Sequence, residues 1–421
     1  MRLLVALFSF LALAGCREDP DSAPLRFWAM GREGEVVQEL VREFEAANPD
    51  VRVDVQQIPW SAAHEKLLTA FVGGITPDLA QLGNTWVAEF VALKALAPWN
   101  DSLAAAGIDS ADHFPGVWNT NVVDGKLYGV PWYVDTRLLF YRTDLLAAAG
   151  HDRPPATWSE WRSALHAVHE LSGGENWGAY LPLNEWALPV ILGLQAGSSL
   201  LNDDATRGDF SGPDFRRGFD FCLDLYDDGL APVTAAGSIA NVYQEFGRGT
   251  FAMYVTGPWN LGEFRRRLPP ELAAAWTTAP MPGPTGPGAS LAGGSSLVVF
   301  SSSRRAAASR RLVAFLTAPE QQVRFYELTG DLPAHRAAWD APALRDDAQL
   351  AAFRMQMERA APTPVVPEWE QIADLVWRAT EAAARGVVSR DEALERLDRQ
   401  VDAVLEKRRW LRGRAAGEGG S

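Results

Sequence analysis

The chain has 421 residues, of which 53 are acidic and 39 basic, giving a formal net charge of −14 at pH 7. Such an excess of negative charge is poorly suited to binding a nucleic-acid backbone. With 47% hydrophobic and 22% charged residues, the composition is that of a globular protein and excludes a largely disordered one. The length is sufficient for two or three domains.

The amino terminus predicts export. An apolar run over residues 3–14 is too short to span a bilayer but long enough for the core of a signal peptide. It ends in Leu13-Ala14-Gly15-Cys16, which resembles a lipobox. We therefore expect residues 1–15 to be a lipoprotein signal peptide, Cys16 to carry the lipid and residues 16–24 to form a tether. The alternative is an ordinary secretory signal with an incidental cysteine. Either way, the rest of the chain is expected outside the cytoplasm, in the periplasm or at the cell surface.

Strand-like and helix-like periodicities then alternate in the manner of an α/β fold. Strands are predicted at 25–30, 51–55 and 78–82. Helices are predicted between them, one ending at Asn48-Pro49-Asp50 and one covering 62–72. This succession favours a mainly parallel sheet that binds ligands at the carboxyl ends of its strands.

The segment from residue 124 to residue 150 combines a turn, an extended run and a short helix. Asp124-Gly125 is a strong turn signal. Residues 127–140 are rich in β-formers, and Pro131 marks an edge or a crossing. Asp135 and Arg137 lie two residues apart on one face of this run, which is either a solvated face or the floor of a polar cleft. A short helix from Thr143, ended by Gly150, follows.

Two capping boxes mark helices in the second half of the chain. Thr157 with Glu160 starts a helix that should run to Gly173-Gly174, and Ser389 with Glu392 starts the last helix. The Pro/Gly-rich residues 279–288 predict a loop, followed by a strand at 296–300. The basic cluster at 407–414 is interpreted as a solvated or frayed tail.

Cysteine and histidine point to no redox or metal centre. Acylation of Cys16 would leave Cys222 without a disulfide partner, and its apolar surroundings predict a buried thiol. His166 and His169 have helical spacing, but no second cluster would complete a metal shell. We expect no metal and no cofactor.

Several short segments occur in an order that resembles family-1 extracellular solute-binding proteins, the sugar-capturing components of ABC importers. They are DGKLYGVP at 124–131, followed by Tyr141 to Gly150, and the segments Pro77–Gln81, Pro155–Glu160, Phe246–Met253, Thr256–Trp259 and Thr329–Ala334. Each is weak alone, but their order is specific. The resemblance implies an α/β fold of the periplasmic-binding-protein type II, with two discontinuous lobes joined by a hinge. The boundaries expected are 25–134 with 283–325 for the N-terminal lobe, 135–282 with 326–408 for the C-terminal lobe, and a tail at 409–421.

A sugar site needs aromatic planes for stacking and polar groups for directional hydrogen bonds. By resemblance to maltose-binding relatives, we expect the ligand-binding residues to be Trp28, Arg32, Glu33, Gln81, Asn84, Trp86, Trp132, Asp135, Arg137, Asn184, Glu185, Trp186, Trp259, Gly294, Ser295, Glu368 and Trp369. Arg137 could pair with Asp135 or hold an acidic ligand. Maltose binders often have an Asp-Arg pair where this chain has Asn84-Thr85, which argues against maltose itself.

The function expected is capture of a carbohydrate between the lobes and its delivery to a membrane permease, by a monomer with no enzymatic activity. The chain has no G-x-S-x-G, H-E-x-x-H or G-x-x-x-x-G-K-(S/T) motif. A secreted glycosidase or polysaccharide lyase remains the rival class, because two carboxylates beside a sugar are enough for glycoside cleavage. Glycerol phosphate and polyamines are alternative ligands on the same fold.

Overall fold

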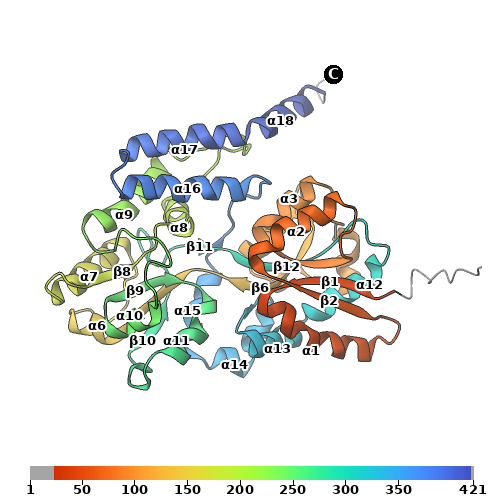
Figure 1. The fold of residues 1–421 in the computed structure, drawn as a ribbon, viewed down its shortest axis with the longest axis horizontal. Coiled ribbons are helices and arrows are strands. Elements are labelled where there is room, and N and C mark those ends of the chain that lie inside the picture. Colours follow the sequence, from red (N-terminus) through yellow and green to blue (C-terminus); the bar gives the residue numbers. More distant parts are fainter. Residues whose placement is uncertain (1–22, 419–421) are drawn as a thin grey trace, which may run out of the picture.

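The computed structural model describes residues 23–418, so the predicted signal peptide, Cys16 and most of the tether lie outside the described residues. Two β-sheets, each covered by helices, build two lobes (Figure 1). In the figure the red and orange elements form one lobe and the yellow and green elements the other. Among the described residues, no helix is both long and apolar enough to cross a membrane.

The first lobe contains a six-stranded sheet of order β13-β6-β12-β3-β1-β2. Its strands are β1 (Leu25–Met30), β2 (Val53–Ile58), β3 (Leu79–Gly83), β6 (Gly129–Asp135), β12 (Gly293–Val299) and β13 (Leu332–Pro333). β1 pairs in parallel with both β2 and β3, whereas β12 runs antiparallel to β3 and β6. The longer helices of this lobe are α1 (Gly31–Ala47), α2 (Trp60–Val72), α12 (Ala306–Leu316) and α13 (Pro319–Thr329). The predicted parallel pairing is confirmed for β1, β2 and β3, but the prediction of a mainly parallel sheet is wrong, because β12, β6 and β13 all pair antiparallel.

The second lobe contains a four-stranded sheet of order β10-β7-β9-β8. Its strands are β7 (Leu138–Arg142), β8 (Trp177–Tyr180), β9 (Phe251–Thr256) and β10 (Trp276–Ala279). Its longer helices are α6 (Thr143–Ala148), α7 (Trp158–Leu171), α8 (Ala187–Ala196), α9 (Pro213–Asp227), α10 (Val242–Arg248), α11 (Leu261–Arg267), α15 (Ala348–Met357), α16 (Trp369–Ala384) and α17 (Arg390–Val404). Both lobes are discontinuous in sequence, as the resemblance implied.

The remaining elements complete the chain. They are η1 (Asn84–Trp86), α3 (Val87–Ala92), η2 (Asn100–Ser102), α4 (Leu103–Ala106), η3 (Ser110–Asp112), α5 (Pro115–Asn119), β4 (Val122–Val123), β5 (Lys126–Leu127), η4 (Pro258–Asn260), η5 (Pro270–Leu272), β11 (Ser290–Leu291), η6 (Arg336–Asp340), α14 (Pro342–Arg345), β14 (Ala360–Ala361) and α18 (Glu406–Glu418). β4 and β5 form a hairpin whose turn residues, Asp124 and Gly125, both have positive φ. Two consecutive residues with positive φ are typical of a type I′ turn, which favours Asp-Gly, so this pair is a reliable signal of a hairpin.

The extended run predicted at 127–140 is divided between the two lobes. β6 ends at Asp135 in the first sheet, and β7 begins at Leu138 in the second. Asp135 and Arg137 therefore lie at the crossing itself. Pro131 tolerates its place in β6 because β13 pairs only with Tyr133 and Val134, and β12 shifts its register beside it.

The two later crossings differ from the predicted boundaries. Gly283 still pairs with Thr157 of the second lobe, and the chain passes between the lobes at β11, which pairs with β14. The boundary expected at 283 is therefore several residues too early. Likewise, β13 belongs to the first sheet, although residues from 326 onward were assigned to the second lobe. Propensity shows that a strand forms, but its lobe depends on which distant strand it pairs with.

Local predictions made from spacing are confirmed in part. Thr157 and Glu160 form a complete capping box. At Ser389 only half of the predicted box is present, in which its side chain accepts a hydrogen bond from the backbone amide of Glu392, and the helix that it starts is followed by α18 and is not the last. Cys222 is fully buried in the second lobe. The basic cluster predicted as a solvated or frayed tail lies in the helix α18, where Lys407, Arg412 and Arg414 are exposed.

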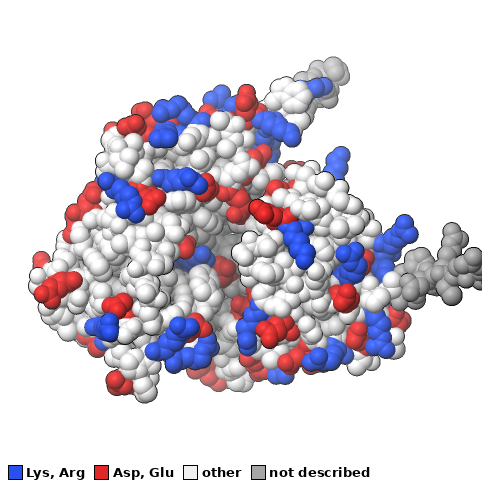
Figure 2. Space-filling model, viewed as in Figure 1, with Lys and Arg blue, Asp and Glu red and all other residues white. Residues whose placement is uncertain are grey.

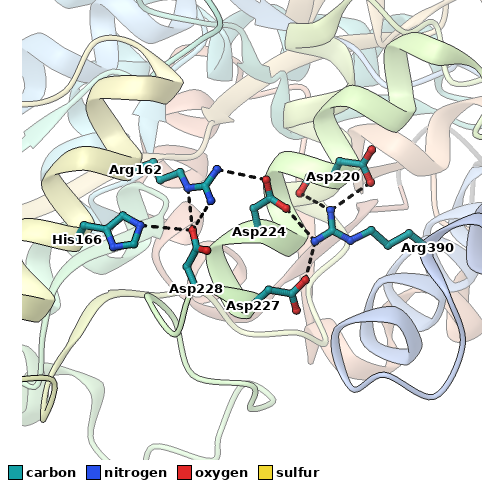
Figure 3. A network of polar contacts seen from close by, with 7 residues as sticks. All are labelled: Arg162, His166, Asp220, Asp224, Asp227, Asp228 and Arg390. Atoms are coloured by element: carbon teal, nitrogen blue, oxygen red, sulfur yellow. Dashed lines mark hydrogen bonds and ion pairs between the residues drawn. The ribbon is translucent and has the colours of Figure 1, made fainter.

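A network of charged side chains holds α17 against α9 and α7 (Figure 3). Arg390 contacts three carboxylates of α9, at 3.3 Å from Asp220, 2.8 Å from Asp224 and 2.6 Å from Asp227. Arg162 of α7 lies 3.4 Å from Asp224. α16 packs between α17 and the helices α8 and α9, so the last helices are part of the second lobe.

Candidate functional site

A cleft separates the two lobes and is lined by both. Two cavities, of about 410 and 930 Å³, share the lining residues Glu33, Trp60, Pro258, Trp259 and Asp331 and are therefore parts of one cleft. Figure 2 shows the molecule hollowed between its lobes, with acidic and basic side chains inside the hollow. The cleft lies at the carboxyl ends of β1 and β3, where an α/β sheet binds its ligands.

On the first lobe, Glu33 is the centre of a polar network. Its Oε1 accepts hydrogen bonds from the Tyr133 hydroxyl at 2.8 Å, the Trp60 indole at 3.2 Å and the Gln81 amide at 3.5 Å. Gln81 also donates to the hydroxyls of Tyr133 and Ser295, both at 3.2 Å. Burial and the neighbouring Glu33 charge raise the pKa of Tyr133 well above its usual value, so Tyr133 stays protonated as a donor. The network holds the Glu33 carboxylate in one orientation.

The chain places Glu33 in the cleft by a sharp turn after β1. Gly31 has φ +49°, and a Cβ there would lie 2.8 Å from Cδ1 of Trp60. Only glycine combines that backbone with so close an indole. Glu33 then falls in the first turn of α1, where the helix dipole favours a negative charge.

On the other side of the cleft, Trp259 presents the most exposed aromatic surface. It lies in η4, directly after β9, and its side chain is 46% exposed. Its ring packs against Gly257, where any side chain would overlap it. The Arg137 guanidinium carbon lies 4.4 Å from the ring centre, and Arg137 also contacts Asp135 at 3.2 Å. A Cβ at Gly293 would overlap the Asp135 carboxylate, so glycine there makes room for it.

Further aromatic side chains extend both sides. Trp60 and Trp86 of the first lobe make an edge contact, with their ring centres 5.8 Å apart. Trp186 lies on the opposite lobe, edge-on to the buried Trp369 at 5.6 Å. Indole rings from both lobes therefore line one cavity.

The electrostatics of the cleft are dominated by carboxylates. Burial, with the neighbouring Glu33 and Asp135 charges, raises the pKa of Asp331 to about 7. Burial also raises the pKa of Asp135, although the Arg137 charge acts in the opposite direction. Ligand groups that donate hydrogen bonds, such as hydroxyls, would stabilise these buried carboxylates in their charged form.

The structure brings together most of the residues expected from the sequence. A small cavity of about 80 Å³ adjoins the cleft and shares Arg137 and Trp259 with it. The expected residues that line the cleft or this small cavity are Arg32, Glu33, Asn84, Trp86, Asp135, Arg137, Glu185, Trp186, Trp259 and Gly294. Gln81 and Ser295 are buried behind Glu33 and position it. Asn84 has its amide bound to the backbone oxygen of Ala292 at 2.6 Å, so part of its hydrogen-bonding capacity is used within the protein.

Other expected residues lie elsewhere. Trp132 has no exposed surface and stacks on Phe325 at 4.4 Å in the core of the first lobe. Trp28 is buried in the same lobe, with the Lys66 ammonium 5.1 Å from its ring centre. Trp369 is buried in the core of the second lobe. Large indole rings commonly pack in a protein core, and these three tryptophans do so and do not line the cleft.

Two polar residues expected in the site are also placed outside it. Glu368 lies 3.9 Å from Arg408 and borders a separate groove beside α18. The Asn184 side chain accepts a hydrogen bond from the backbone amide of Ala236, which directs it into a loop. These contacts join distant segments, so no local pattern indicated them.

Trp60, Tyr133 and Asp331 were missed. Tyr133 is the neighbour of Trp132 in β6, and neighbours in a strand point to opposite faces. Asp331 occupies the variable position of the motif Thr329–Ala334, so a carboxylate within a family motif could have indicated a site residue. Trp60 follows the proline after β2 and starts α2 at the end of the sheet where ligands bind.

The arrangement is chemically suited to binding. Indole faces, carboxylates, amides and one guanidinium surround the cavity, and together they can hold a polar ring with many hydroxyl groups. Within residues 23–418, no group of His, Cys, Asp and Glu side chains has the arrangement of a metal site.

Comparisons with known proteins agree with this geometry. Residues 29–323 match the family described as bacterial extracellular solute-binding protein. The sugar-binding protein MalE from Xanthomonas citri has 48% identity and a TM-score of 0.90, covering 92% of this chain and 99% of that one. The GacH receptor of Streptomyces glaucescens, solved unliganded and with acarbose, has 25% identity and a TM-score of 0.77, covering 91% and 98%.

An uncharacterized lipoprotein of Streptomyces antibioticus is 33% identical over 210 residues, 46% of this chain and 45% of that one. The homologues are substrate-binding proteins, so the glycosidase or lyase alternative is not supported. The chain therefore belongs to the bacterial extracellular solute-binding proteins, as a family-1, maltose-binding-protein-like member of the ABC transport systems.

Proposed function

We propose that this protein captures a carbohydrate between its lobes and delivers it to the permease of an ABC importer. The observation that carries the proposal is the cleft lined from both lobes by Trp60, Trp86, Trp186 and Trp259 together with Glu33, Asp135 and Asp331. Indole faces stack on the C–H faces of sugar rings, and carboxylates accept bonds from sugar hydroxyls. The names of the sugar-binding MalE and of the acarbose-bound GacH support the same ligand class.

The mechanism of capture is closure of the lobes. A ligand that contacts Glu33 on one lobe and Trp259 on the other gains all its contacts only when the lobes close on it. It therefore shifts the hinge equilibrium toward the closed form, which a permease can distinguish from the open one. Micromolar affinity, about −8 kcal/mol, would suit capture followed by release. A monomer suits this delivery.

The lipid anchor is part of the proposal. Cys16 follows the lipobox-like residues Leu13-Ala14-Gly15, and a lipoprotein is among the relatives. Acylation at Cys16 would hold the protein at the membrane that contains its permease. Mass spectrometry of the membrane-extracted protein should find a modified Cys16 as the first residue; an unmodified amino terminus at any other position would contradict the anchor.

The charge of the cleft separates the alternative ligands. In the 410 Å³ part of the cleft, the carboxylates of Glu33, Asp135, Asp331 and Glu370 share one guanidinium, that of Arg137. This excess of carboxylate disfavours glycerol phosphate, whereas it favours a polyamine as the second candidate. Binding of a polyamine in place of any sugar would therefore be the most informative failure.

The test is a thermal-shift panel followed by calorimetry. The soluble chain from residue 17 onward is mixed with neutral mono- and oligosaccharides, uronic acids, glycerol phosphate and polyamines. A ligand at a hundred times its dissociation constant should add about 2.7 kcal/mol to the unfolding free energy. A saturable shift with an intact neutral sugar supports the proposal. A shift with polyamines alone, or cleavage of the sugar, would refute it.

A further inference from the structure

The carboxyl-terminal helix α18 presents an unusual face. It projects from the layer formed by α16 and α17 toward the chain end marked C in Figure 1. Lys407, Trp410, Leu411 and Arg414 are spaced i, i+3, i+4 and i+7, so they form one stripe along the helix. All four are exposed, with Trp410 at 58% and Leu411 at 51%. We call these four residues the α18 stripe.

Other residues of α18 fix the helix to the second lobe. Arg409 donates to the backbone oxygens of Thr206 at 2.9 Å and Asp402 at 3.2 Å. Arg412 donates to the backbone oxygen of Asp204 at 2.8 Å. These contacts orient the helix. Lys407 and Leu411 of the α18 stripe also line the groove beside α18 that Glu368 borders.

The chemistry of the α18 stripe matches a membrane surface. Trp prefers the level of the lipid headgroups, and Lys and Arg extend their charged ends to that level while their stems cover apolar surface. The Arg414 guanidinium already lies 5.0 Å from the Trp410 ring centre, so cation and indole are presented together. Residues 407–417 contain five basic side chains and no acidic one.

Charge selects the occupant of this face. The whole chain has a net charge of −14, which opposes contact with an anionic bilayer, whereas residues 407–414 carry five basic side chains. A second copy would bring another row of cations against this one, which disfavours self-association. Anionic lipid phosphates complement the stripe, and each Lys or Arg close to such a surface adds about 1 kcal/mol of attraction.

We propose that the α18 stripe lies on an anionic membrane surface, with Trp410 and Leu411 among the headgroups and Lys407 and Arg414 beside lipid phosphates. This contact is independent of the ligand cleft. With the proposed lipid at Cys16, it would give the protein a second attachment. Residues 16–24 can reach at most about 30 Å, so the anchor would hold the protein itself near the bilayer.

Vesicle binding tests the proposal. The chain from residue 17 onward contains every residue that the structure describes and lacks the predicted lipid site. It is sedimented with vesicles of phosphatidylcholine alone or mixed with phosphatidylglycerol. Binding is expected only to the anionic vesicles and should weaken with salt. Lys407→Gln and Arg414→Gln should each lower the partition coefficient roughly fivefold. Arg52→Gln and Lys94→Gln, two exposed cations elsewhere, are matched controls that should not.

The apolar part of the contact needs its own variant. Trp410→Ser with Leu411→Ser should remove most vesicle binding, while Val72→Ser with Val387→Ser, which are also exposed, should leave it unchanged. Unaltered melting and sugar affinity would show that the variants remain folded. Binding that is absent, indifferent to lipid charge, or equal in the α18 and control variants overturns the proposal. So does a dimer that Trp410→Ser abolishes without any vesicle binding.

Discussion

Arg137 lies over the ring of Trp259, with its guanidinium carbon 4.4 Å from the ring centre, while Asp135 holds the same guanidinium at 3.2 Å. The exposed aromatic surface of the cleft is thus shared with a cation of the protein itself. A ligand that stacks on Trp259 has to displace Arg137 or stack beside it. Arg137 lies at the first crossing between the lobes, after β6 ends at Asp135 and before β7 begins at Leu138.

Trp259→Ala should weaken ligand binding by roughly five- to a hundredfold, since the stacking surface is worth about 1–3 kcal/mol. Titration calorimetry with the ligand found in the panel measures the change. Trp259 is 46% exposed, so the melting temperature of the free protein should change little. Trp410→Ala, at another exposed indole, is the control. Equal affinity of the wild type and Trp259→Ala would place the ligand elsewhere.

Asp135→Asn should reduce affinity about tenfold or more, because a charged acceptor for ligand hydroxyls becomes a neutral amide. The substitution also removes the partner of Arg137, which frees the guanidinium to move. It preserves size and shape, so the lobes should fold normally. Calorimetry gives the affinity, and circular dichroism checks the fold. Unchanged binding would assign Asp135 a purely structural role.

The raised pKa of Asp331, about 7, predicts the direction in which the stability of the protein changes with pH. The folded value lies above the ordinary aspartate value, so the folded protein retains a proton that the unfolded chain releases. The resulting stabilisation is complete below about pH 4 and is lost as pH rises through about 7. Its full size is on the order of a few kcal/mol.

Asp331→Asn isolates this contribution. The unfolding free energy of the wild type minus that of Asp331→Asn should fall between pH 5.5 and pH 8, measured by urea denaturation at each pH. The difference is needed because His64, whose pKa is raised, and His113 and His335, whose pKa values are lowered, also contribute to the total. Glu33, Asp135 and Arg32 are the charged groups that act on Asp331. A difference that is constant with pH would contradict the assignment.

Arg390→Met should destabilise the second lobe by about 1–2 kcal/mol, because it leaves Asp220, Asp224 and Asp227 without their shared cation (Figure 3). The estimate is reduced for the partial exposure of these groups. Arg399→Met, which breaks only an exposed pair with Glu395, should cost no more than about 0.5 kcal/mol. Urea midpoints compare the two. Ligand affinity should be unchanged in both variants. Equal urea midpoints would show that the Arg390 network does not contribute measurably to stability.

Predictions based on nearby residues succeeded because their contacts lie within the same turn. The Thr157 and Glu160 side chains bond to backbone amides three residues apart, and the Asp124-Gly125 turn depends on two consecutive residues. The alternating apolar pattern likewise indicated the first strands and helices, although the second strand begins at Val53 and not at Val51. Order and spacing of several such motifs identified the family.

The sequence by itself therefore determined the family, the α/β class and the stretch of chain that crosses first between the lobes. Only the tertiary structure decided which of Trp132 and Tyr133 faces the cleft, that β13 belongs to the first sheet, and that Asp331 lies beside Glu33. The physical reason is distance along the chain. A side chain's surroundings in the cleft come from strands and loops hundreds of residues apart, and their packing, not local propensity, sets which groups meet.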